Sequence, residues 1–178
     1  YEKARKYAYK SLKKWEETGD KIHIGHTLRM LAMLDLYQGK HLEGREKLEK
    51  ALRLFKKIEN KEGIAEVYVS FANFAYYNQD YQAAIDYLQK PFEIYSEFES
   101  KGILARFYNA FARLYTQIGR TDKASEYYLK ELKIREETSS EENKAWYYFT
   151  IVNLYRSWGN YKKALENLNK AAEHLDRK

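Results

Sequence analysis

The chain has 178 residues, with no Cys, one Pro and eight Gly, and it carries a formal net charge of +6. Without Cys it can form no disulfide, no thiolate metal site and no catalytic thiol. It contains no run of 18 apolar residues, so the sequence offers no candidate membrane-spanning helix. One third of the residues are charged and few residues break regular structure, a composition that favours helices.

The sequence repeats with a period of 40 residues. Small residues recur at this interval in some columns of the repeat, and large apolar residues recur in others. The clearest columns are Gly25, Ala65, Ala105 and Ala145; Ala32, Ala72, Ala112 and Val152; Leu34, Phe74, Leu114 and Leu154; and Gly44, Ala84, Ala124 and Ala164. So many columns in one register indicate a repeat protein rather than a single irregular domain.

Within each period the apolar residues follow helical spacing, as at Tyr68, Phe71, Ala72 and Ala75. In chain order, this spacing predicts helices at residues 1–18, 22–38, 42–58, 62–78, 82–98, 102–118, 122–138, 142–158 and 162–176. Each full repeat therefore consists of two helices, which we call helix A and helix B in chain order.

The boundaries between helices follow the same period. Four residues that can cap a helix start lie 40 apart, namely Asp20, Asn60, Ser100 and Ser140. The turn inside each repeat is marked by Gly39, Gln79, Gly119 and Gly159. Gly adopts a left-handed backbone at little cost, so we expect that conformation in this column.

These columns resemble the tetratricopeptide repeat, most fully at Tyr155, Gly159, Tyr161 and Ala164 and also at Ala112, Tyr115, Gly119 and Ala124. The commonest unit of that family has about 34 residues, so the present unit resembles an extended variety. The chain departs from the pattern at Asp35, Ala75, Gln79, Pro91 and Glu131. The resemblance implies an all-α fold: a right-handed superhelical solenoid of antiparallel helix pairs, with about nine helices.

We expect residues 1–178 to form a single array. Its predicted parts are helix B of a truncated unit at 1–20 and four units at 21–60, 61–100, 101–140 and 141–178. The chain opens with Tyr1 and both of its ends lack a polar capping helix, so we expect a fragment of a larger protein. Apolar surface at these uncapped ends could also support a homo-oligomer.

The sequence shows no catalytic motif. His23 and His26 share a helical face, but no third ligand stands at the right spacing to complete a metal site. Phosphate-binding loops and Gly-flanked nucleophilic Ser residues are also missing. We therefore expect no enzyme, no metal and no cofactor.

The resemblance implies that helix A of each unit lines a concave groove that binds peptides. The candidate groove residues are Arg29, Met33, Tyr37, Asn73, Tyr77, Arg106, Asn109, Arg113, Trp146, Asn153 and Arg156. An Asn side chain can donate to and accept from one peptide unit, which suits an extended backbone. Four Arg side chains in the same concavity would favour an acidic segment or a C-terminal carboxylate.

The leading hypothesis is a non-catalytic module of a regulatory or scaffold protein that binds a protein or peptide. The alternative is a structural spacer or self-association segment of a bacterial transcriptional regulator or sensor kinase. RNA binding ranks third, because the five successive parts carry +2, +4, −5, +3 and +2 rather than one continuous basic stripe. We expect no membrane partner and a cytoplasmic location, with a periplasmic sensor domain as the alternative.

Overall fold

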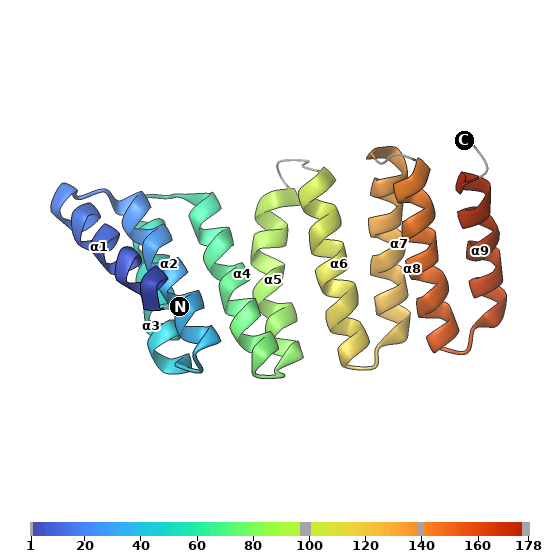
Figure 1. Cartoon of the computed structure of the whole chain (residues 1–178), viewed down its shortest axis with the longest axis horizontal. Helices are drawn as coiled ribbons and strands as arrows, with labels where there is room; N and C mark the ends of the chain where they lie inside the picture. Colours follow the sequence, from blue (N-terminus) through green and yellow to red (C-terminus); the bar gives the residue numbers. More distant parts are fainter. Residues whose placement is uncertain (1, 97–100, 139–140, 176–178) are drawn as a thin grey trace. The chain divides into compact units, whose positions relative to one another are not determined.

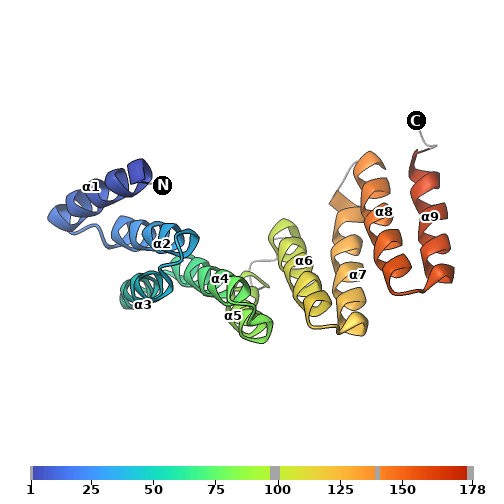
Figure 2. The same cartoon turned by 60° about the horizontal axis from the view of Figure 1, so that its bottom comes forward.

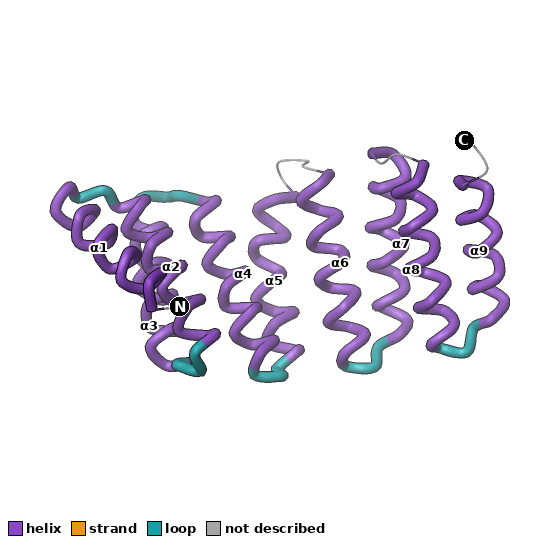
Figure 3. The backbone as a smooth tube through the Cα atoms, in the orientation of Figure 1, coloured by secondary structure: helices purple, strands orange, loops and turns teal. Residues whose placement is uncertain are grey.

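The computed structural model of the protein describes residues 2–96, 101–138 and 141–175, together with their side chains except those of residues 138 and 141–143. The described residues form α-helices and no strand (Figures 1 and 3). The helices are α1 (Glu2–Thr18), α2 (Lys21–Tyr37), α3 (His41–Lys57), α4 (Lys61–Tyr77), α5 (Tyr81–Ser96), α6 (Lys101–Gln117), α7 (Thr121–Thr138), α8 (Glu141–Ser157) and α9 (Tyr161–Leu175).

The all-α repeat fold predicted from the sequence is confirmed. Each helix lies within one or two residues of its predicted range, and sequential helices pack as pairs, α2 with α3, α4 with α5, α6 with α7 and α8 with α9. Helix A of the four predicted repeats corresponds to α2, α4, α6 and α8. Helix B corresponds to α3, α5, α7 and α9, and α1 is the leading helix B.

The turns between paired helices share one geometry. Gly39, Gly119 and Gly159 have φ values of 73°, 74° and 71°, as the column predicts. The backbone N–H after each of these glycines bonds back to the helix, for example from Lys40 to the carbonyl of Asp35 at 2.9 Å. This bonding satisfies carbonyl groups that the helix end leaves open. Gln79 takes the same conformation, with φ 62°, although it has a side chain.

Two of the four predicted helix caps lie in described residues, and both are confirmed. The side chain of Asp20 accepts a hydrogen bond from the backbone N–H of His23 at 3.1 Å, and Asn60 accepts from Gly63 at 2.6 Å. The other two, Ser100 and Ser140, fall outside the described residues.

The chain divides into two compact units, Tyr1–Phe98 and Glu99–Lys178. The first unit holds α1–α5, and the second holds α6–α9. The prediction of one continuous array with boundaries at 20, 60, 100 and 140 remains a prediction.

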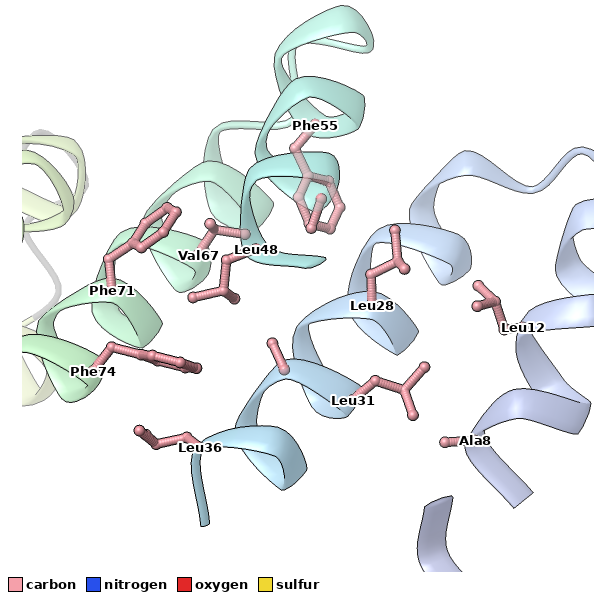
Figure 4. Packing of buried hydrophobic residues seen from close by; sticks show 12 residues of the cluster. Ala8, Leu12, Leu28, Leu31, Leu36, Leu48, Phe55, Val67, Phe71 and Phe74 are labelled. Atoms are coloured by element: carbon pink, nitrogen blue, oxygen red, sulfur yellow. The ribbon is translucent and has the colours of Figure 1, made fainter. Parts of the chain in front are cut away.

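In the first unit, the core runs through the helices from α1 to α4 (Figure 4). Leu31 from α2 and Leu48 and Phe55 from α3 are completely buried, and Val67 from α4 completes the cluster. Figure 2 shows α3 lying against α2 and α4. The ring of Phe55 sits where Gly25 and Gly63 leave space, since a Cβ at Gly63 would lie 2.4 Å from its Cδ1 atom. Because Gly25 on α2 and Gly63 on α4 have no side chain, the aromatic ring of Phe55 on α3 fits between the two helices.

A buried charge cluster joins α1, α2 and α3. Asp35 is completely buried, and its carboxylate contacts Arg5 at 2.5 Å and Lys47 at 2.7 Å. This is the column in which the later repeats carry Tyr115 and Tyr155. The departure from the repeat pattern at Asp35 is therefore an ion cluster that binds the leading helix to the first repeat.

In the second unit, one core cluster is formed by Leu132 of α7, by Tyr148, Ile151 and Tyr155 of α8, and by Ala164 and Ala171 of α9. The tyrosine of the repeat motif, Tyr155, is 5% exposed and so belongs to this core. Within the part of the chain that the structure describes, no helix is long and apolar enough to span a membrane.

Candidate peptide-binding surfaces

The predicted groove residues lie on helix A of their repeats. Those of the first unit are on α2 and α4, and those of the second unit are on α6 and α8. Each of these two surfaces therefore belongs to its own unit.

In the first unit, the structure brings Tyr37 and Tyr77 together. Their rings meet edge to face with centroids 5.9 Å apart, and both side chains are about half exposed. Asn73 lies exposed one helical turn before Tyr77. Met33 is partly buried and packs against the core cluster, so it contributes more to the core than to the surface.

Arg29 already has a partner within the first unit. Its guanidinium contacts the carboxylate of Glu66 on α4 at 3.1 Å, and His26 contacts the same oxygen at 3.1 Å. The sequence predicts Arg29 as a binder of ligand carboxylates, whereas the structure shows it neutralised by an acidic residue of the next helix A. The contact joins residues of neighbouring repeats, and sequence spacing alone does not reveal it.

The second unit contains a cavity of about 210 Å³ between its helices. Asn109 of α6 lies on one side of it, and Trp146 of α8 lies at its rim with 65% of its surface exposed. The remaining lining residues are Tyr128, Glu131, Leu132 and Arg135 from α7 and Tyr147, Thr150 and Ile151 from α8. The predicted residues Asn109 and Trp146 thus lie at one site. Helix α7, which is helix B of the repeat that contains Asn109, also contributes to this site.

The polar part of this cavity centres on Glu131, which is only 4% exposed. One carboxylate oxygen accepts a hydrogen bond from Nε of Arg135 at 2.8 Å, and the other accepts from Nδ2 of Asn109 at 2.8 Å. The guanidinium of Arg135 lies 4.5 Å from the ring centre of Tyr147. Sequence reasoning missed Arg135 and treated Glu131 only as a break in a column of small residues, although that break was the available signal.

Tyr128 contributes a neutral hydroxyl to the cavity wall. Burial raises the pKa of Tyr128, and this effect outweighs the hydrogen bond with Thr116 and the positive charge of Arg113, both of which lower it. Tyr128 therefore keeps its proton at neutral pH and can donate or accept a hydrogen bond.

Exposed basic side chains also lie on α6 and α8, two of the helices that line the cavity. Arg106 and Arg113 are exposed on α6, three residues before and four residues after Asn109, which places all three on one helical face. The α6 sequence contains no acidic residue. On α8, Asn153 and Arg156 are exposed, and Phe149 is 53% exposed. Among the described residues, no group of three or more His, Asp or Glu could hold a metal ion.

Paired antiparallel helices in a regular 40-residue register define a helical repeat protein. The tetratricopeptide repeat family matches the sequence in two overlapping stretches, residues 63–137 and 104–177. The chain therefore belongs to the tetratricopeptide repeat family. Such repeats are known as protein–protein interaction modules of regulatory and scaffold proteins, and they are generally non-catalytic.

Solved structures with the same fold come from several kinds of protein. One is a signal transduction ATPase with numerous domains and a tetratricopeptide repeat sensor from Pyrococcus horikoshii (TM-score 0.77, 21% identity, 92% of this chain and 26% of that chain). Another is aspartyl phosphate phosphatase F from Bacillus subtilis (TM-score 0.72, 18% identity, 93% of this chain and 44% of that chain). A third is BtubC from P. vanneervenii (TM-score 0.71, 18% identity, 88% of this chain and 65% of that chain).

At these identities the similarity shows the fold alone. The chain spans less than two thirds of the length of each of these three proteins. Comparison with curated proteins gave no match.

Proposed function

We propose that this chain is a non-catalytic interaction module that binds an extended segment of a partner protein along its helix A surfaces. The observation that carries the proposal is the cavity of the second unit, with the exposed Trp146 at its rim and exposed arginines on the adjacent α6 surface. Trp and Arg side chains are the commonest energetic anchors of protein interfaces. The module would be part of a regulatory or scaffold protein.

The amide side chains favour an extended peptide over a folded domain. Asn73 in the first unit and Asn153 in the second occupy the same repeat position, and both are exposed. Each can donate to and accept from one peptide group of the partner without reading its side chain. Such contacts favour an extended strand, whose peptide groups have no internal partners.

The charges favour an acidic segment or a C-terminal carboxylate, at least at the second unit. Arg106, Arg113 and Arg156 are exposed there, and a guanidinium can bind a carboxylate through two parallel hydrogen bonds. The residues of α6 supply no acid that could compete for them. Arg29 contributes less to this preference, because Glu66 already neutralises it.

The proposal can be tested by selecting binders from a phage-displayed library of random dodecapeptides on the full chain. We expect the selected peptides to lose at least about tenfold in affinity for the double variant Asn153→Ala with Arg156→Ala, since each contact contributes about 1 kcal/mol or more. The matched control is Lys162→Ala with Asn169→Ala, which removes a cation and an amide from the exposed surface of α9. Circular dichroism should show unchanged helicity and melting temperature for both variants.

A self-association segment is the alternative function, and α9 provides the observation that favours it. Tyr161, Leu165, Leu168 and Leu175 follow helical spacing on this helix, and each is between 39% and 70% exposed. If the selection yields no peptide and sedimentation shows concentration-dependent dimers, this alternative replaces the peptide-binding proposal. The peptide-binding proposal would also be contradicted by peptides that bind the Asn153/Arg156 variant as tightly as they bind the wild type.

A further inference from the structure

The cavity of the second unit owes its polar character to one departure from the repeat. In the 40-residue register, position 131 corresponds to Ala51, Pro91 and Ala171, all of which are buried. Glu131 is buried as well, but it places a carboxylate where the other repeats pack a small or rigid apolar residue. A buried carboxylate is costly unless it is paired and hydrogen-bonded, and Glu131 accepts hydrogen bonds from both Arg135 and Asn109.

The partners of Glu131 hold two other side chains in defined positions. Arg135 donates through Nε, and its terminal nitrogens make no hydrogen bond to any described residue. Asn109 donates through Nδ2, which leaves its carbonyl oxygen without a donor among the described residues. The cavity therefore presents one fixed set of N–H donors and one fixed acceptor. A single peptide group, with one C=O and one N–H, has the complementary pair.

Apart from the hydroxyl groups of Tyr128 and Thr150, the rest of the cavity is apolar, and it is small. Leu132, Ile151 and the rings of Trp146 and Tyr147 line it. The cavity has a volume of about 210 Å³. This is below the roughly 300 Å³ at which pockets for drug-sized ligands begin. It suits one amino-acid side chain rather than a cofactor.

We infer that this cavity is a specificity pocket for one bulky apolar residue of the partner segment, with an adjacent peptide group bound by Arg135 and Asn109. The inference rests on the proposed function and names the residue class that one site of the groove selects. The side chain packs against Trp146, Leu132 and Ile151. The peptide carbonyl accepts hydrogen bonds from Arg135, and the peptide N–H donates to Asn109.

A carboxylate is the competing occupant, and the charge inside the cavity disfavours it. Among the described residues, Arg135 is the one cation that lines the cavity, and it is already paired with Glu131, so the two charges cancel. A second carboxylate would come close to Glu131, and like charges at short range oppose one another. The exposed arginines Arg106 and Arg113 lie on α6 outside the lining residues, where they can bind acidic residues that flank the apolar anchor.

Capped amino acids can test this pocket without knowledge of the partner. We would titrate the ¹⁵N-labelled full chain with N-acetyl-leucinamide, N-acetyl-alaninamide and the α-amide of N-acetyl-aspartate, and follow the indole and backbone amide signals of Trp146 by NMR. The leucine probe should bind with a Kd on the order of millimolar, as expected for a ligand with about a dozen heavy atoms. The alanine probe should bind about tenfold more weakly, since it buries less apolar surface.

Two variants and one matched control assign the binding to the cavity. Trp146→Ala removes an aromatic ring that lines the cavity and should lower the affinity for the leucine probe at least about fivefold. The affinity would be measured from the backbone amide signals of α8. Phe149→Ala removes a similarly exposed aromatic from the same helix, but this residue does not line the cavity, so the affinity should stay unchanged. Glu131→Ala restores the residue found at Ala51 and Ala171 and should fold, yet weaken the probe by releasing Arg135 and Asn109. Circular dichroism confirms that each variant is folded.

The inference is overturned if the aspartate probe binds more tightly than the leucine probe, or if Trp146→Ala and Phe149→Ala have equal effects. Neither result contradicts the proposed peptide binding, provided that the selected dodecapeptides still need Asn153 and Arg156 for full affinity. Conversely, the leucine probe could bind in the cavity while no selected peptide depends on Asn153 and Arg156. That result would support the specificity pocket and contradict the binding of an extended segment along helix A.

Discussion

Gln79 is one of two non-glycine residues with a positive φ in the described part of the chain, the other being Glu59. Its φ of 62° lies in the left-handed region, where the three equivalent positions all carry Gly. A residue with a Cβ costs about 1–2 kcal/mol in this conformation. The turn keeps its geometry at Gln79 because the hydrogen bonds that close the helix end are retained, including the one from Asp80 to the carbonyl of Ala75 at 2.9 Å.

We therefore expect Gln79→Gly to raise the free energy of unfolding by about 1 kcal/mol, because it relieves the left-handed strain. The matched change is Gly119→Ala, for which a Cβ would meet no atom within 4 Å, so only the backbone is affected. It should lower the free energy of unfolding by about 1 kcal/mol. Urea denaturation followed by circular dichroism measures both, and equal signs for the two variants would contradict this account.

The sequence predicts the conformation of single residues well where local chemistry decides it. The left-handed turns at Gly39, Gly119 and Gly159 follow from residue type alone. Asp35 and Glu131 stand out in the sequence as departures, but the sequence does not reveal what they bind. Their partners Arg5 and Asn109 lie 30 and 22 residues away, so only the packing of helices brings them into contact.

At the scale of helices, the close approach of α2, α3 and α4 depends on the absence of side chains at Gly25 and Gly63. The ring of Phe55 fills the space that both glycines leave. The column Gly25, Ala65, Ala105 and Ala145 indicates that a small residue is needed on helix A, but it does not identify Phe55 as the reason. Helix positions are thus predictable from periodicity, whereas the contacts that set their separation are not.

Gly63→Ala should lower the free energy of unfolding by about 1–2 kcal/mol, because the overpacking against Phe55 exceeds the gain in helix propensity. In a Phe55→Leu background the same change should cost less, since the smaller side chain leaves room for the new methyl group. The control is Gly102→Ala, also in the first turn of a helix, where a Cβ meets nothing within 4 Å. A gain of up to about 1 kcal/mol is expected there, from helix propensity alone. If Gly63→Ala lowers the free energy of unfolding equally in the wild-type and Phe55→Leu backgrounds, the overpacking against Phe55 is not the cause.

At the scale of the whole molecule, function depends on which helix surfaces remain available after the core has formed. Packing uses the motif residues, such as Tyr155 and Ala164, and leaves Trp146, Asn153 and Arg156 exposed on α8. The repeat register predicts which residues lie on helix A. It does not predict which of them already have partners, as Arg29 has in Glu66.

The most direct test of the central claim is a map of where a bound segment lies. A dodecapeptide selected on the full chain would be mixed with variants that carry p-benzoylphenylalanine at position 149 on α8, position 133 on α7 or position 169 on α9, all exposed in the structure. If helix A binds the partner, irradiation should cross-link the peptide from position 149 and not from positions 133 or 169. Cross-linking from the helix B positions without cross-linking from position 149 would show that the partner binds elsewhere and would contradict the account.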